Sequence, residues 1–149
     1  PAITPIIWEA ARRLDVRYER SVLLYQSALF KDRYPQANIR FDNWVEVPAV
    51  EGDQRASLKL MRERMFSDHS YEAAVFIGGM EGVIDEFELL QDLAPEATLV
   101  PLAAPGGVSR DLFDRVEGLP QEMRNRTDFT YWLYRILQID PSEPRVLVG

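Results

Sequence analysis

A strand-like apolar run that leads into glycines and acids is the part of this sequence best suited to chemistry. Residues 73–77 read Ala-Ala-Val-Phe-Ile, residues 78–82 read Gly-Gly-Met-Glu-Gly, and an amphipathic segment containing Glu86 follows. This order predicts a strand, a tight turn and the start of a helix. Glycines let the backbone approach a ligand closely, and the unpaired N–H groups at a helix N-terminus attract anions. The pattern therefore indicates a nucleotide-like ligand.

Carboxylates follow the glycines at Glu81, Asp85 and Glu86. Acids in the first turn of a helix interact favourably with the helix dipole, which accounts well for Glu81. Glu86 lies one turn further along, where the dipole explains it less well. A carboxylate repels phosphate but accepts hydrogen bonds from ribose hydroxyls. For Glu86 a role near the ribose or glycosidic bond and a purely structural role both stay open.

Arg62 and Arg64 supply positive charge upstream of the glycines. They lie two residues apart in a predicted helix, so their side chains point in different directions and at most one faces a cleft. We favour Arg62 as the ligand-binding residue. The alternative is a surface arginine that pairs with Asp68 or Glu63.

Two other segments follow predicted strands. Ser27 comes directly after an apolar run, where its hydroxyl either reaches a phosphate or caps the following turn. Gly106 and Gly107 come after another apolar run and are candidates for a second wall of the cleft.

The residue types give little support for a metal site or for a catalytic nucleophile. The sequence has no cysteine and one histidine, His69. Disulfides, thiolate catalysis and zinc-thiolate sites are therefore excluded, and we expect neither a metal site nor a bound cofactor. Asp68 and Ser70 flank His69, but adjacent residues rarely converge on one reacting atom as a catalytic triad requires.

The length and the net charge of the chain limit the kinds of protein and of partner that are expected. The 149 residues are expected to form a single domain, and 24 acidic against 17 basic residues give a net charge of −7. Such a balance argues against duplex nucleic acid as a partner, because phosphate binding needs clustered Lys and Arg. No apolar run approaches the ~20 residues of a membrane span. Without a recognisable signal peptide either, we expect a cytoplasmic protein with no membrane partner.

Periodic apolar patterns predict alternating helices and strands. Helices are expected over about residues 4–15, 54–66, 83–94, 109–116 and 129–137, and strands over residues 21–26, 43–47, 73–77 and 98–102. The polar residues 27–41 predict a loop with at most a helical turn. Alternating strands and helices predict an α/β fold with a mainly parallel sheet. Because the chain opens with a helix, we expect the first strand of the sheet to be missing from this chain.

Four segments together resemble the SLOG superfamily: Pro1-Ala-Ile-Thr-Pro5, Tyr25-Gln-Ser27, Arg62-Glu-Arg-Met65 and the run from Gly78 to Glu86. These are Rossmann-like domains related to the LOG (lysine-decarboxylase-like) phosphoribohydrolases and to the nucleotide-sensing N-terminal domains of TRPM channels. The resemblance implies a Rossmann-like three-layer sandwich. In that family a strand and a glycine turn precede the Pro-Ala-Ile-Thr-Pro helix start, which agrees with the missing strand.

The resemblance also implies a function. Compared with the LOG glycine motif, this chain has one extra residue before its third glycine, Val83 in place of a threonine, and Glu86 at the glutamate. These departures are similar to the sensor branches of the superfamily, in which such domains regulate effector modules of bacterial antiviral systems and assemble as oligomers. The expected role is a sensor for a nucleotide-derived signal, either ADP-ribose-like or a cyclic nucleotide, in a homo-oligomer with an attached or associated effector. The expected ligand-binding residues are Pro1, Ser27, Arg62, Gly78, Gly79, Met80, Glu81, Gly82, Val83 and Glu86.

The alternative function implied by the same resemblance is catalytic. A LOG-like N-glycosidase cleaves a nucleoside monophosphate into base and ribose phosphate. In that case Arg62 orients the substrate, and Glu86 stabilises the developing oxocarbenium charge or positions water. Loss of the threonine hydroxyl at Val83 and the altered glycine turn favour the sensor.

Overall fold

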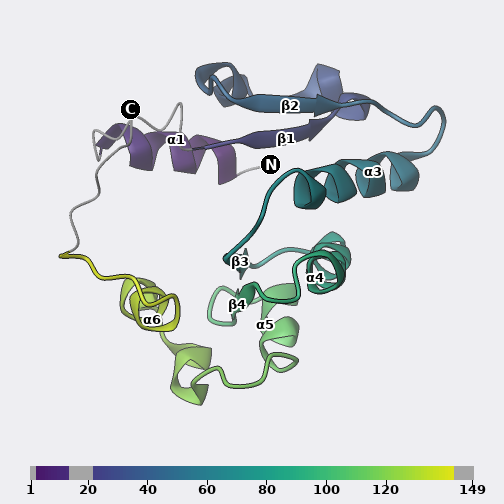
Figure 1. Ribbon diagram of the computed structural model, residues 1–149. Coiled ribbons are helices and arrows are strands. Elements are labelled where there is room, and N and C mark those ends of the chain that lie inside the picture. The colour runs from purple at the N-terminus through teal and green to yellow at the C-terminus, as the bar shows by residue number, and fades with distance from the viewer. Residues whose placement is uncertain (1–2, 14–21, 143–149) are drawn as a thin grey trace. The chain divides into compact units, whose positions relative to one another are not determined.

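The computed structural model describes residues 3–13 and 22–142 and divides the chain into two compact units, Pro1–His69 and Ser70–Gly149 (Figure 1). Each unit pairs two parallel strands and carries helices between or beside them. Among the described residues, no helix has both the length and the apolar character needed to cross a bilayer.

The first unit is built on strands β1 (Leu24–Ser27) and β2 (Trp44–Val47). They pair in parallel from Leu24 opposite Trp44 to Ser27 opposite Val47. Its helical segments are α1 (Ile3–Arg13), the 3-10 helices η1 (Ala28–Arg33) and η2 (Gln36–Arg40), and α3 (Gln54–Ser67). Helix α3 packs against both strands. Asp53 caps it, because its carboxylate accepts a hydrogen bond from the Ala56 N–H at 2.9 Å.

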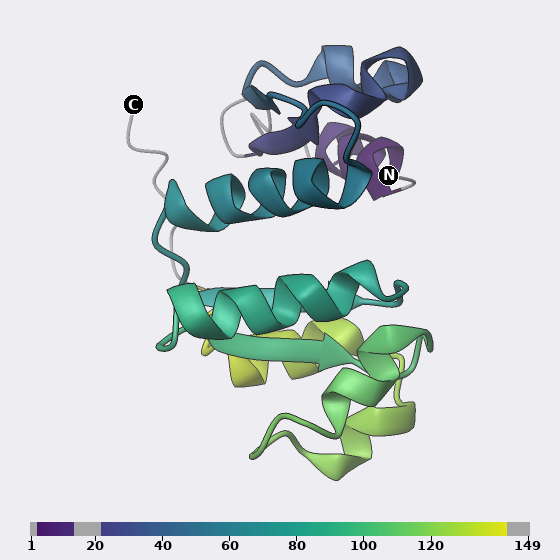
Figure 2. The same cartoon turned by 90° about the vertical axis from the view of Figure 1, so that its right-hand side faces the viewer.

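The second unit is a strand–helix–strand unit with further helices after it. Strands β3 (Ala73–Ile77) and β4 (Thr98–Leu102) pair in parallel, with α4 (Gly82–Leu93) as their connection. Helix α4 lies alongside the strands (Figure 2), and its Phe87 meets Phe76 of β3 edge-on with ring centroids 5.4 Å apart. The chain continues through α5 (Val108–Phe113), the 3-10 helix η3 (Gln121–Asn125) and α6 (Phe129–Ile136).

Apolar burial holds these later helices against β4. One buried cluster joins residues of β4, the loop after it and all three following helices: Val100, Leu102, Ala103, Phe113, Met123 and Trp132. Fully burying side chains of this size contributes about 1.5–3 kcal/mol each, so the cluster fixes the carboxyl end of β4 and the loop that follows it.

The α/β, Rossmann-like class predicted from the sequence is confirmed by the parallel strands and intervening helices. Strands over residues 73–77 and 98–102 have the predicted bounds. The structure differs over residues 27–41, where two 3-10 helices replace most of the expected loop. It also ends α5 at Phe113, because the bonds from Arg115 to Leu112 and from Val116 to Phe113 continue the chain as turns.

Candidate functional site

Two glycine-rich loops meet at the carboxyl ends of β3 and β4, and we call them the paired glycine loops: residues 78–81 and residues 103–107. The last residues of the two strands, Ile77 and Leu102, are register partners, so both loops leave the same edge of the sheet. Four glycines in the loops have positive φ, at 64° and 86° for Gly78 and Gly79 and at 79° and 65° for Gly106 and Gly107. In open α/β sheets this edge is where ligands bind.

Backbone hydrogen bonds join the two loops directly. The N–H of Val108 donates to the carbonyl of Gly79 at 3.1 Å, and the N–H of Ser109 donates to the carbonyl of Gly78 at 3.0 Å. A Cβ on Gly107 would lie 2.7 Å from the carbonyl oxygen of Gly79. Only glycine therefore allows this close approach of one backbone to the other.

The buried hydroxyl of Ser109 forms hydrogen bonds with both loops. It accepts a hydrogen bond from the N–H of Gly78 at 2.8 Å, and its proton is within reach of the carbonyls of Leu102 at 2.7 Å and Gly106 at 3.0 Å. From the sequence, this serine is predicted only to begin a helix over residues 109–116. The overlooked signal was a serine two residues after a glycine pair.

These bonds decide which helix can offer N–H groups to an anion. Those of Val108 and Ser109, at the start of α5, are already used by the carbonyls of the other loop. Helix α4 begins differently: its first turn is closed by bonds from Val83 to Met80 at 2.8 Å and from Ile84 to Glu81 at 2.9 Å. The N–H groups of residues 81 and 82 precede these bonds and have no partner within the helix. The start of α4 is thus the better anion site.

The predicted residues of this segment take distinct positions. Val83 packs against Gly79, where a Cβ would collide with its side chain. Met80 is 82% exposed, Glu81 is exposed at the N-cap without a side-chain capping bond, and Glu86 is half-buried. Exposed Met80 and Glu81 can meet a ligand directly, whereas the contact of Val83 with Gly79 supports the turn.

The other predicted site residues lie in the first unit or outside the described part of the chain. Ser27, at the end of β1, is buried, and its hydroxyl accepts a bond from the Leu29 N–H at 3.4 Å, which confirms the capping interpretation. Arg62 is half-buried on α3, while Arg64 pairs with Asp68 at 2.9 Å. Pro1 lies outside the described residues.

Comparison with known protein families shows to which family the chain belongs. A model of the SLOG cluster3 family matches residues 1–137. The chain belongs to this family. The SLOG match includes both the Arg62 helix and the paired glycine loops, and it indicates a nucleotide-related domain. No curated protein and no solved structure matches the chain.

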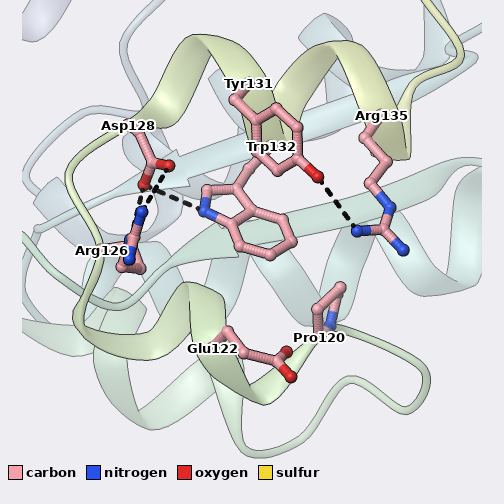
Figure 3. A pocket seen from close by; sticks show the side chains of 7 residues that line it. All are labelled: Pro120, Glu122, Arg126, Asp128, Tyr131, Trp132 and Arg135. Atoms are coloured by element: carbon pink, nitrogen blue, oxygen red, sulfur yellow. Dashed lines mark hydrogen bonds and ion pairs between the residues drawn. The ribbon is translucent and has the colours of Figure 1, made fainter.

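The SLOG domain has a concave surface beside α6, shown in Figure 3. This cavity of about 570 Å³ lies between η3 and α6. Trp132 forms its centre, with the Arg126–Asp128 ion pair on one side and Arg135 on the other. Asp128 accepts two bonds from Arg126 and one from the indole N–H of Trp132, all at 3.2 Å, and it is the N-cap of α6. Its contacts hold the indole in place and the start of α6 with it.

Arg135 shares this cavity with Trp132. Its guanidinium lies 5.8 Å from the indole ring centroid and donates to the Tyr131 hydroxyl at 3.3 Å. Both partners of Arg135, Trp132 and Tyr131, also belong to α6. In the described part of the SLOG domain, no three His, Asp or Glu side chains are grouped to hold a metal ion.

The ion pair of Asp128 with Arg126 predicts a pH-dependent stability. Hydrogen bonds from Arg126 hold the pKa of Asp128 below its ordinary value of 3.8. A lowered pKa in the folded state stabilises the protein above the unfolded-state value, and this contribution is lost as the pH falls through the folded-state pKa. We expect Asp128→Asn to lower the thermal midpoint at pH 7, with the difference from wild type shrinking as the pH is taken below 3.8.

Glu122→Gln is the matched control for this pH dependence, because Glu122 lines the same cavity and forms no ion pair with any described residue. Thermal melts of both variants between pH 2 and pH 7 give the comparison. Equal pH profiles for Asp128→Asn and Glu122→Gln would contradict the assignment.

Proposed function

We propose that this SLOG domain binds a nucleotide-derived signal, ADP-ribose-like or cyclic, at the paired glycine loops. The observation that carries the proposal is the backbone contact between the loops, which positions the start of α4 beside a second glycine turn. Phosphate oxygens bind the free N–H groups at the start of α4. Glu86, one turn further along α4, accepts hydrogen bonds from ribose hydroxyls.

The proposed consequence of binding is regulation of an effector rather than turnover of the ligand. A ligand shifts such a domain only by binding one arrangement more tightly than another. The loops are suited to this, because both are tied to the same buried serine, Ser109. When the start of α4 closes on a phosphate, the hydrogen bonds of Ser109 shift β4 and α5 as well. This movement then changes the contact with a second copy of the chain or with an attached effector.

Calorimetry tests this proposal with ADP-ribose, cyclic ADP-ribose, cyclic dinucleotides and AMP as titrants. We expect at least one to bind, and Glu86→Gln to weaken its affinity about tenfold, the value of a hydrogen bond to a charged group. Arg62→Ala is titrated as well, as a separate test of the arginine that the sequence predicts to bind the ligand.

Two variants serve as matched controls. Glu88→Gln removes a carboxylate from the same helix, one that pairs with Arg115 at 3.4 Å, and Arg55→Ala removes an exposed arginine from α3. Both should bind like wild type. No binding of any titrant by the folded protein would refute the proposal. Release of free base from AMP by wild type, and not by Glu86→Gln, would instead establish the N-glycosidase.

A further inference from the structure

The cavity between η3 and α6 is lined by none of the residues of the paired glycine loops (Figure 3). Small-molecule sites have volumes of about 300–1,000 Å³ and combine aromatic or apolar walls with a few polar groups that orient the ligand. This cavity, at about 570 Å³, has that size and that composition. Trp132 lies at its centre, Pro120 borders it, and charged side chains line the rest.

Buried apolar residues fix the two walls of this cavity. Met123 of η3 is 1% exposed and Trp132 of α6 is 6% exposed, and both belong to the buried cluster that also contains Leu102 of β4. Because η3 and α6 share one core, their separation is set by the packing beneath them. The cavity therefore exists before a ligand arrives, which lowers the entropic cost of binding.

Some of the polar groups in the cavity are already occupied. Asp128 accepts two hydrogen bonds from Arg126 and a third from the indole N–H of Trp132. This arrangement neutralises one pair of charges and uses the indole donor. The charged groups of the lining that are left for a ligand are the carboxylate of Glu122 and the guanidinium of Arg135.

Glu122 and Arg135 carry opposite charges but do not form an ion pair. Neither pairs with an oppositely charged side chain in the described part of the chain, and in Figure 3 Pro120 lies between their charged ends. Arg135 gives one N–H to the Tyr131 hydroxyl, which leaves its other N–H groups for a ligand. A guanidinium binds a carboxylate with two parallel hydrogen bonds, and a carboxylate accepts charge-assisted bonds from an ammonium group.

We propose that this cavity binds a small apolar zwitterion, either a free amino acid or a short peptide with both ends free. Arg135 binds the carboxylate of the ligand, Glu122 binds its ammonium group, and its apolar side chain packs against Trp132 and Pro120. A ligand with both charges fits because each of its ends meets an unpaired group of opposite sign. Anions such as nucleotides fit poorly, because Glu122 and Asp128 repel them.

NMR on the full chain tests this site through the indole N–H signal of Trp132. The protein has three tryptophans, so Trp8→Phe and Trp44→Phe identify the other two indole signals. The probes are leucine, phenylalanine and leucyl-phenylalanine, each also acetylated at the amine or amidated at the carboxylate, together with AMP. We expect at least one zwitterion to shift the Trp132 signal, and removal of either of its charges to weaken binding about tenfold or more. The free amino acids and the dipeptide distinguish the two sources of the ligand.

Two substitutions assign the two charges of the ligand to their partners. Glu122→Gln should weaken binding of the zwitterion about tenfold and leave the affinity for the acetylated analogue unchanged. Arg135→Gln should have the same effect on the zwitterion and leave the affinity for the amidated analogue unchanged. A purely structural effect of either substitution would weaken all of these ligands equally.

Two further variants are controls. Glu117→Gln removes an exposed carboxylate of the second unit that does not line the cavity, and Arg55→Gln removes an exposed arginine of α3. Both should bind the zwitterion like wild type.

Three results would overturn the proposal. The first is no shift of the Trp132 indole signal with any of the zwitterions. The second is an equal loss of affinity for the zwitterion and its capped analogues in Glu122→Gln or Arg135→Gln. The third is an equal shift with AMP, which would make the cavity a general anion site. Because Glu86 and the paired glycine loops do not line this cavity, binding of the zwitterion and binding of the nucleotide-derived signal can fail independently.

Discussion

Replacing Gly107 with alanine is expected to destabilise the second unit by about 3 kcal/mol. Two costs add at this position. Its φ of 65° and ψ of −162° lie in a region that is essentially restricted to glycine, where a side chain costs about 1–3 kcal/mol. The new Cβ would also lie 2.7 Å from the carbonyl oxygen of Gly79 and 2.9 Å from the carbonyl carbon of Gly78. Both neighbours are backbone atoms held by hydrogen bonds, so relieving the clash requires separating the loops, at a further 1–3 kcal/mol or so.

Gly106→Ala is the control that separates these two costs. Its φ of 79° is also positive, but a Cβ there meets nothing within 4 Å. It should therefore lose only the conformational part, about 1 kcal/mol. Urea unfolding of both variants gives the comparison, and signal binding should fall in Gly107→Ala alone. Equal losses of stability would show that the contact between the loops does not restrict residue 107.

Local patterns predicted the second unit well. Residues 73–77 and 98–102 are continuous apolar runs closed by glycine or proline turns, and such runs leave little choice of register or end. The first unit was predicted less closely, because its strands have only four residues each and the segment between them forms 3-10 helices. Short 3-10 turns leave no apolar periodicity to detect.

The sequence predicted the two glycine turns but not the contact between them. Glycine pairs after strands are visible in sequence, so both paired glycine loops were expected to line one cleft. That they touch could not be predicted, because contact depends on the register of β3 with β4 and on the burial of Ser109.

Removing the hydroxyl of Ser109 should have the next largest effect. Ser109→Ala leaves the N–H of Gly78 without its acceptor and the carbonyl of Leu102 without a donor, in a position with no exposed surface. Leaving a buried group unpaired costs about 1–3 kcal/mol, so we expect a loss of about 2 kcal/mol. The amide of Gly78 should then exchange with solvent faster, because its bond to the serine is what protects it.

Ser57→Ala provides the matched control for Ser109→Ala. Ser57 is equally buried and equally bonded: its hydroxyl accepts from the N–H of Val50 at 2.9 Å and donates to the carbonyl of Asp53 at 2.7 Å. Its loss should cost similar stability, but in the first unit, with exchange at Gly78 unchanged. If the proposed function is correct, Ser109→Ala also weakens binding of the signal while Ser57→Ala does not. Slow exchange at Gly78 in Ser109→Ala would mean that the backbone bonds from Val108 and Ser109 hold the loops together without the hydroxyl. In that case the serine would fill space at the site, and the transmission of binding from α4 to α5 would depend on the backbone alone.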